Sequence, residues 1–143
     1  MKRIYTFSNW LIGGLLALLG VATNSCGEHM LKYGVPTADF QVGGQITERG
    51  TDKELDDIQV EVKFKNDWES FADTVYTDAE GKYFSEQHGV LPTANDSVIV
   101  TFNDTTGAHR SQQVAEKLQY KGGDHSWYEG KAQLTIDAEL EKQ

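Results

Sequence analysis

The 143-residue chain has little of several features that would define a class of protein. It contains 1 Cys and 2 Pro and has no Cys-x-x-Cys pair, which excludes an internal disulfide framework and a cysteine-based zinc or thiol-exchange site. Basic residues are also few, since 13 Lys and Arg stand against 22 Asp and Glu and give a net charge of -9. This charge repels a phosphate backbone, so we expect no nucleic-acid binding. The length fits one modest domain.

The longest apolar run lies near the amino terminus and is too short to span a membrane as a helix. Lys2 and Arg3 come before it, and residues 10–21 are apolar apart from three glycines. A spanning helix needs about 20 apolar residues, whereas the core of a secretory signal peptide needs about 7 to 15. We therefore predict that residues 1–25 are an export signal that is removed from the mature protein.

The single cysteine follows this segment directly. The residues Ala22-Thr23-Asn24-Ser25-Cys26 resemble a bacterial lipobox, although Thr23 stands where that signal usually has Leu. The resemblance implies that a lipid such as palmitate is attached to Cys26 and that cleavage makes Cys26 the new amino terminus. The expected location is the cell envelope, anchored to a membrane and most simply the outer membrane. The alternative is ordinary secretory cleavage, which leaves Cys26 as a free thiol.

A short segment separates Cys26 from the part of the chain with a regular hydrophobic pattern. Residues 26–37 are mostly polar and lack both the helical and the strand period, which predicts a lipid-anchored tether. Tyr33, Gly34 and Pro36 within it are a candidate recognition segment, because an aromatic residue beside Gly and Pro offers accessible extended backbone. The alternative is a tether that packs along the edge of the domain.

Residues 38–143 are predicted to form one domain, an antiparallel β-sandwich. Apolar and polar residues alternate with the period of a half-buried strand in residues 38–47, 58–65 and 132–139, and residues 97–103 predict another strand because they are rich in β-branched residues. Further strands are predicted at residues 73–77, 82–86 and 111–120, the last of which also fits a helical spacing. Turn residues occupy positions 78–81, 104–107 and 121–124. About seven short strands and no long amphipathic helix after the signal helix indicate a transthyretin-like or Ig-like sandwich.

The pattern also predicts how individual side chains are placed. Residues 73–77 and 82–86 are expected to form a hairpin across the turn at 78–81, with Tyr83 and Phe84 reaching inward. Trp127 is expected to cap the core, whereas Trp68 lies in a polar loop. If the domain binds a ligand, the candidate contacts are the aromatic residues Trp68, Tyr76 and Tyr128.

Three segments together resemble the carboxypeptidase-regulatory-like, transthyretin-type sandwich domains. They are residues 40–47 (FQVGGQIT), 58–62 (IQVEV) and 77–83 (TDAEGKY). In that family a Gly-x-Ile/Val-Thr strand, a Val-rich strand and a Thr-Asp-x-x-Gly-x-Tyr hairpin occur in this order. Leu55-Asp56-Asp57 stands where the family usually has Pro-Gly before the second strand. The resemblance implies the same all-β fold.

Nearly the whole chain is also similar to small lipoproteins encoded beside a radical SAM enzyme in Gram-negative anaerobes. The similarity rests on Met1-Lys2-Arg3, residues 33–40 (YGVPTADF), the Gly44 strand, the turn at 78–81 and residues 126–130 (SWYEG). The resemblance implies a lipid-anchored protein without catalytic activity that is a partner or substrate of the enzyme. The alternative is a surface or periplasmic module that binds carbohydrate or protein.

Patterns typical of catalysis or metal binding are scarce. Asp124-His125-Ser126 has the residue types of a hydrolase triad, but neighbours on a strand point to opposite faces. Neither 78–81 nor 103–107 has the alternating oxygen ligands and distant Glu of a calcium loop, so turn formation explains both. The four histidines are irregularly spaced and are expected to be solvated: His29, His88, His109 and His125. We therefore expect no enzyme activity, cofactor or metal.

Overall fold

The computed structural model describes residues 34–143. The predicted export signal, the lipid-attachment residue Cys26 and Tyr33 lie outside the described residues. Within residues 34–143 the structure is all-β and has nine strands: β1 Thr37–Glu48, β2 Gln59–Lys65, β3 Ser70–Tyr76, β4 Lys82–Val90, β5 Ser97–Asn103, β6 Gln112–Lys117, β7 Lys121–Gly122, β8 Tyr128–Thr135 and β9 Ala138–Leu140. This part of the chain contains no helix that could cross a bilayer.

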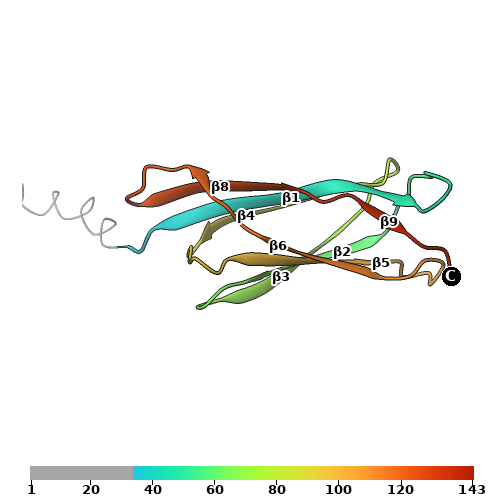
Figure 1. The fold of residues 1–143 in the computed structure, drawn as a ribbon, viewed down its shortest axis with the longest axis horizontal. Helices are drawn as coiled ribbons and strands as arrows, with labels where there is room; N and C mark the ends of the chain where they lie inside the picture. The colour runs from blue at the N-terminus through green and yellow to red at the C-terminus, as the bar shows by residue number, and fades with distance from the viewer. Residues whose placement is uncertain (1–33) are drawn as a thin grey trace, which may run out of the picture. The chain divides into compact units, whose positions relative to one another are not determined.

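The strands form two sheets that pack face to face (Figure 1). One sheet has the order β4-β1-β8-β7, with β9 also paired to β1, and the other has the order β3-β2-β5-β6. The predicted all-β sandwich is therefore confirmed. The second sheet is antiparallel throughout, whereas β1 pairs in parallel with β8 and β9. No hairpin joins these distant segments, so nothing restricts them to antiparallel pairing.

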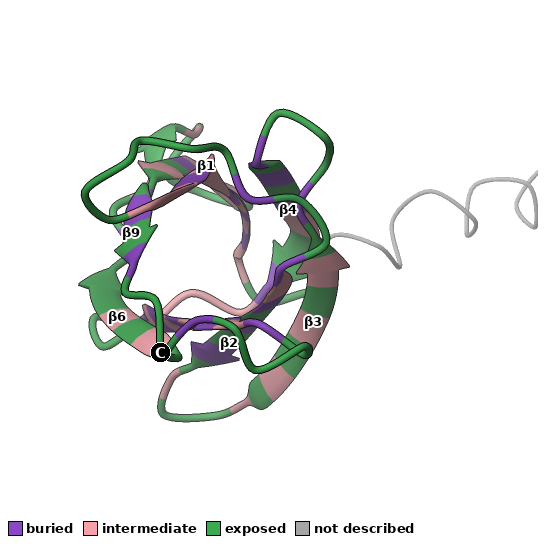
Figure 2. Cartoon of the chain, turned by 90° about the vertical axis from the view of Figure 1, so that its right-hand side faces the viewer, coloured by how far each residue is buried: buried purple, intermediate pink, exposed green. Residues whose placement is uncertain are grey.

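The core lies between the sheets and is built from the alternating apolar residues. Figure 2 shows the buried positions on the inner faces of the strands and the exposed positions outside. Phe40 from one sheet stacks on Phe64 from the other, with 5.3 Å between ring centroids. Phe64 also contacts Phe71 at 5.1 Å, and Tyr83 meets Phe102 edge to face at 5.7 Å. The Phe40–Phe64 and Tyr83–Phe102 contacts therefore join the two sheets.

The last predicted strand, residues 132–139, is divided into β8 and β9. Ile136 N–H donates to the Gly43 carbonyl at 2.8 Å, and Gln45 N–H donates to the Asp137 carboxylate at 2.8 Å. A Cβ at Gly44 would lie 2.1 Å from the Ile136 carbonyl oxygen, so only glycine fits this approach. The Asp137 side chain thus accepts the Gln45 N–H in place of a backbone carbonyl. This contact interrupts the parallel pairing between β1 and residues 128–140, and the register is the same on both sides of the interruption.

The predicted hairpin across residues 78–81 is wrong, although the turn itself forms. Gly81 has φ 74° and donates its N–H to the Asp78 carbonyl. However, β3 pairs with β2 and β4 pairs with β1, so the turn carries the chain from one sheet to the other. Turn residues determine where a chain reverses but not which strands then pair. The hairpin partner of β3 is β2, joined to it through residues 66–69.

Two aromatic side chains lie outside the core, contrary to the prediction. Phe84 is 56% exposed and Trp127 is 46% exposed. Tyr83 does point inward, and its hydroxyl donates to the Ile136 carbonyl at 2.6 Å. Because successive side chains of a strand face opposite sides, Phe84 cannot accompany Tyr83 into the core. Trp127 belongs to a turn outside the sheets whose N–H groups bond to Asp124. The ambiguous segment 111–120 contains strand β6.

Candidate functional site

A shallow groove lies at the end of the sandwich where β1 begins. Its volume is about 300 Å³. Segments far apart in the sequence supply its walls, which include Val35, Pro36, Trp68, Pro92, Tyr120 and Glu129. We call it the Trp68 groove, because Trp68 is the most exposed large apolar side chain among the described residues, at 66%.

The backbone that carries Trp68 is held by the side chain of Asn66. The Asn66 Oδ1 atom accepts hydrogen bonds from the N–H groups of Trp68 at 2.9 Å and of Glu69 at 2.8 Å. Its Nδ2 atom donates to the Leu91 carbonyl at 2.7 Å. Asn commonly closes such turns because its short side chain reaches the backbone two or three residues on. One side chain therefore fixes the turn and ties it to the loop after β4.

Further hydrogen bonds join the same two loops. Glu69 Oε1 accepts the N–H of Leu91 at 2.9 Å, and Asn95 Nδ2 donates to the Asp67 carboxylate at 3.0 Å. The indole is thus exposed while the loop beneath it is fixed at several points. A binding surface that is already ordered loses less conformational entropy when a ligand arrives, and this increases affinity.

Tyr120 forms a second aromatic part of the groove and is also fixed. Its hydroxyl donates to Asp96 Oδ2 at 2.5 Å, and Asp96 is almost fully buried. Asp96 Oδ1 accepts from the N–H and hydroxyl of Thr93, each at 2.8 Å. Burial, followed by the bond to Asp96, raises the pKa of Tyr120, so the phenol stays neutral at ordinary pH. The groove therefore has a rigid and largely apolar lining.

The residues singled out from the sequence are not all in one place. Pro36 and Trp68 line the Trp68 groove, and Gly34 is exposed near it in the chain. Tyr76 is 53% exposed but does not line the groove. The Tyr128 hydroxyl donates to Asp39 Oδ2 at 2.9 Å, and this bond raises the pKa of Tyr128. Tyr128 thus has a structural partner within the fold.

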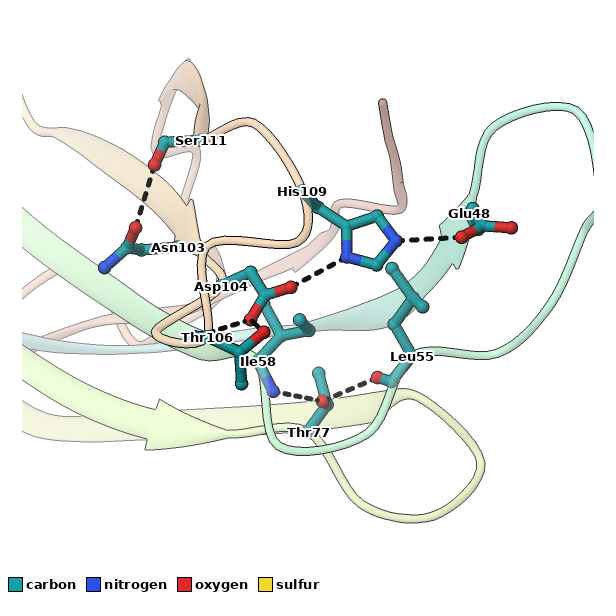
Figure 3. Close-up of polar contacts among 9 residues, drawn as sticks. All are labelled: Glu48, Leu55, Ile58, Thr77, Asn103, Asp104, Thr106, His109 and Ser111. Atoms are coloured by element: carbon teal, nitrogen blue, oxygen red, sulfur yellow. Dashed lines mark hydrogen bonds and ion pairs between the residues drawn. The ribbon is translucent and has the colours of Figure 1, made fainter. Parts of the chain in front are cut away.

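His109 is buried, which contradicts the expectation that it is solvated. Figure 3 shows its ring between two carboxylates, with Nδ1 2.7 Å from Asp104 Oδ2 and Nε2 3.0 Å from Glu48 Oε1. Both partners only accept hydrogen bonds, so the ring satisfies both only as the doubly protonated imidazolium. Asp104 lies only 5 positions from His109 in the β5–β6 connection, but Glu48 comes from the end of β1, 61 positions away, so the sequence gives no sign of the complete cluster.

The hydrogen bonds of the His109 cluster favour the charged forms of His109 and Asp104. The hydrogen bond to Asp104, then that to Glu48, raises the pKa of His109. Burial alone would raise the pKa of Asp104, but hydrogen bonds from Thr106 and His109 lower it overall. In residues 34–143 no three His, Cys, Asp or Glu side chains are arranged to hold a metal ion. The imidazole separates the two carboxylates, and the cluster fastens the end of β1 to the β5–β6 turn.

The remaining polar patterns from the sequence have structural roles. His88 and His125 have side chains 67% and 82% exposed, as expected. The Asp124 carboxylate accepts the N–H groups of Ser126, Trp127 and Tyr128, which lowers its pKa to about 2. Asp78 and Asp104 bond within their own turns in the same way, which confirms the prediction of turn formation.

Sequence reasoning found Trp68 and Pro36 but missed most of the groove. Asn66 two residues before Trp68 is a local signal, because Asn in that position commonly caps a turn. Tyr120 and Glu129 carry no such signal, since they reach the groove only through the pairing of distant strands. The Asp96 that fixes Tyr120 lies 24 positions away in the sequence.

Comparison with known proteins does not identify a family. No protein-family model matches the chain, and no curated protein matches it. The fold is similar to the dioxygenase domain of a dioxygenase carbohydrate-binding protein fusion from the cellulolytic bacterium Streptomyces sp. SirexAA-E, at 12% identity and TM-score 0.46, over 76% of this chain and 84% of that chain. It is also similar to a DUF3823 family protein from Parabacteroides merdae, at 14% identity and TM-score 0.45, over 77% of this chain and 47% of that chain. Neither similarity is close enough to assign a function.

Proposed function

We propose that the protein is a noncatalytic binding module of the cell envelope, anchored by a lipid on Cys26, that holds a carbohydrate in the Trp68 groove. The observation that carries the proposal is the 66% exposed indole of Trp68 on a loop fixed by Asn66 and Glu69. Exposing so large an apolar surface has a solvation cost in the free protein. Binding a ligand recovers that cost.

The dimensions of the groove favour a sugar over a folded protein partner. A volume of about 300 Å³ lies at the lower end of the range for small-ligand pockets. A stable protein interface buries about 1,200 Å² or more, which one shallow groove does not supply. A pyranose ring has an apolar C–H face that fits the flat indole, and its hydroxyls can reach Thr93 and Glu129 at the edge. A longer glycan can continue out of the open ends.

The charge around the groove restricts the class of sugar. Among residues 34–143, its lining includes the carboxylate of Glu129 and no Lys or Arg. An anionic sugar would meet this carboxylate without a cationic partner, which costs free energy in a partly dehydrated site. We therefore propose a neutral or amino sugar as the ligand rather than a uronic acid.

The test is to titrate the full chain with neutral, amino and acidic oligosaccharides by calorimetry. We expect binding of the neutral or amino class, and loss of it in Trp68→Ala, because Trp anchors commonly contribute about 2 kcal/mol or more. Tyr76→Ala is the control, since it removes another exposed aromatic, 53% exposed against 66% for Trp68, from outside the groove and should leave affinity unchanged. Equal losses in both variants, or no binding of any sugar, would reject the proposal.

The membrane anchor is tested separately. Labelled palmitate should enter the protein in a bacterial host and should fail to enter Cys26→Ala. The variant should be released from the membrane fraction, because this acidic chain gains no electrostatic attraction to an anionic leaflet. Incorporation of label into Cys26→Ala would contradict the anchor without affecting the groove.

The pairing with a radical SAM enzyme and membership of the carboxypeptidase-regulatory-like family stay predictions from sequence resemblance. One structural feature makes the substrate role testable at a defined place: Gly34 is exposed and Pro36 lines the groove. Mass spectrometry of the protein made with and without the enzyme should show a mass change in the peptide that spans residues 33–36. Identical masses, after allowance for the lipid, would reject the substrate role.

A further inference from the structure

A second hollow lies along one side of the sandwich, and its lining residues Gln119 and Lys121 flank Tyr120 of the Trp68 groove. Near the carboxyl terminus the two sheets are joined there by backbone bonds from Arg110 N to Glu141 O at 2.8 Å and from Gln143 N to Ala108 O at 2.9 Å. At the other end residues 118–120 cross from β6 to β7. Between these two connections of the sheets lies a slot of about 630 Å³, which we call the seam slot. The strands at its walls are visible in Figure 1.

Both walls of the seam slot are strand edges with free backbone groups. Within residues 34–143, β6 is the edge strand of its sheet and pairs only with β5. On the opposite wall, β7 covers β8 only at Gly130 and Lys131, so residues 132–135 have no strand on their outer side among the described residues. Free strand edges are templates for pairing with another extended chain. The slot therefore offers main-chain hydrogen bonds as well as side chains.

The side chains around the slot are basic, although the whole chain has a net charge of -9. Lys117, Lys121 and Lys131 line it together with a single carboxylate, that of Glu116. Lys131 contacts Glu86. Lys117 and Lys121 have no ion-pair partner within residues 34–143. The slot is thus a local region of positive charge in which Glu86 pairs with Lys131, while Lys117 and Lys121 are without an ion pair among the described residues.

The pairing of β7 with β8 sets two of these lysines against each other. Lys121 lies directly opposite Lys131 in the antiparallel pair, and like charges in that relation destabilise a sheet. β7 and β8 approach each other closely here, since a Cβ at Gly130 would lie only 2.2 Å from the Lys121 carbonyl oxygen. This close approach holds the two lysines opposite each other. Glu86 offsets the charge of Lys131, but Lys121 has no ion-pair partner within residues 34–143. Such conflicts commonly mark binding sites.

We propose that the seam slot binds an extended acidic segment of a partner protein, which adds as a strand to the free edge of β8. Its backbone pairs with residues 132–135, and its carboxylates lie against Lys117 and Lys121. Main-chain pairing supplies affinity, and the alternating side chains supply selectivity. An acidic segment also relieves the repulsion between Lys121 and Lys131.

A second copy of this chain fits the slot less well. Symmetric pairing of the same edge in two copies would bring the same lysines together, which repels. Lysines on an edge also discourage unspecific aggregation. If the lysines served only to prevent aggregation, the slot would have no affinity for acidic peptides. A binding experiment with such peptides therefore distinguishes protection of the edge from binding of an acidic segment.

The test uses short synthetic peptides and the full chain. One peptide alternates Glu with Val and Thr, a second has Lys in place of Glu, and a third is the acidic peptide with alternate amides N-methylated to block strand pairing. We expect only the first to bind in calorimetry. Lys117→Glu with Lys121→Glu should weaken binding by about tenfold or more, because it replaces two attractions by repulsions. Lys63→Glu with Lys65→Glu is the matched control, since these exposed lysines lie on the outer face of β2.

Three results would overturn the proposal. They are no binding of the acidic peptide at millimolar concentration, equal binding of the N-methylated peptide, or equal loss in the two double variants. Trp68→Ala should leave peptide binding unchanged, so failure of the Trp68 groove proposal is distinguishable from failure of this one.

Discussion

Replacing Phe64 by Ala tests the contact between the two sheets. Phe64 lies on β2 and is fully buried. Its ring stacks on Phe40 of the opposite sheet at 5.3 Å and contacts Phe71 at 5.1 Å. Truncation would remove both aromatic contacts and leave a cavity at the centre of the sandwich. Because strands surround the position on both sides, the structure can collapse into the cavity only in part.

The size of the effect follows from this burial. Phe-to-Ala changes in cores cost about 3–5 kcal/mol, and the loss of two aromatic contacts places Phe64→Ala in the upper part of that range. The total free energy of unfolding of a small domain is about 5–15 kcal/mol, so the variant should lose about a quarter of it or more. The melting temperature should fall by roughly 10–20 °C.

Urea unfolding followed by circular dichroism measures the difference. Phe84→Ala is the control, because Phe84 is 56% exposed on the outer face of β4 and should change stability by no more than about 0.5 kcal/mol. A loss below about 1 kcal/mol in Phe64→Ala, or equal losses in the two variants, would refute the description of the core.

Three further predictions concern single side chains. The raised pKa of His109 means that its imidazolium stabilises the fold fully below the unfolded value of about 6.5, and this contribution is lost as pH rises through the folded value. The stability difference between the native protein and His109→Gln, from urea titrations, should therefore shrink between about pH 6 and pH 9; a constant difference would contradict the cluster. Asn66→Ala should weaken sugar binding in calorimetry several-fold, because it frees the loop under Trp68, and unchanged affinity would show that the ordered loop is not needed. Gly44→Ala should destabilise the fold by about 2 kcal/mol or more in thermal melts, since its Cβ would overlap the Ile136 carbonyl, and an unchanged melting temperature would show that β1 and residues 136–137 are not in close contact.

Alternation along single strands was sufficient to predict the fold class. Val60, Val62 and Phe64 face the core and Glu61, Lys63 and Lys65 face solvent, as the period of two requires. The pairing of strands was not predictable in the same way. The turn at 78–81 has the same residues whether it closes a hairpin or connects two sheets, and only the competition of β2 for β3 decides between them. The parallel pairing of β1 with β8 joins positions about 92 residues apart.

The candidate site, too, was only partly predictable from the sequence. Trp68 was recognisable as an exposed loop aromatic, and Pro36 as part of an accessible segment. His109 was not recognisable as buried, because its second partner, Glu48, reaches it from the end of β1, 61 positions away. Tyr120 lines the groove through the pairing of distant strands, and its hydroxyl is held there by Asp96, 24 positions away. Features encoded within a few residues were predictable, whereas features that depend on packing across the sandwich were not.

The most direct measurement of the central claim is an NMR titration of the indole N–H signals of the ¹⁵N-labelled full chain with the oligosaccharide that binds in calorimetry. The chain has 3 Trp, so each signal can be assigned by single Trp→Phe variants. The account predicts that the Trp68 signal shifts most and saturates with the calorimetric affinity, because a sugar ring stacks on that indole. A Trp68 signal that stays in place while the sugar binds would contradict it.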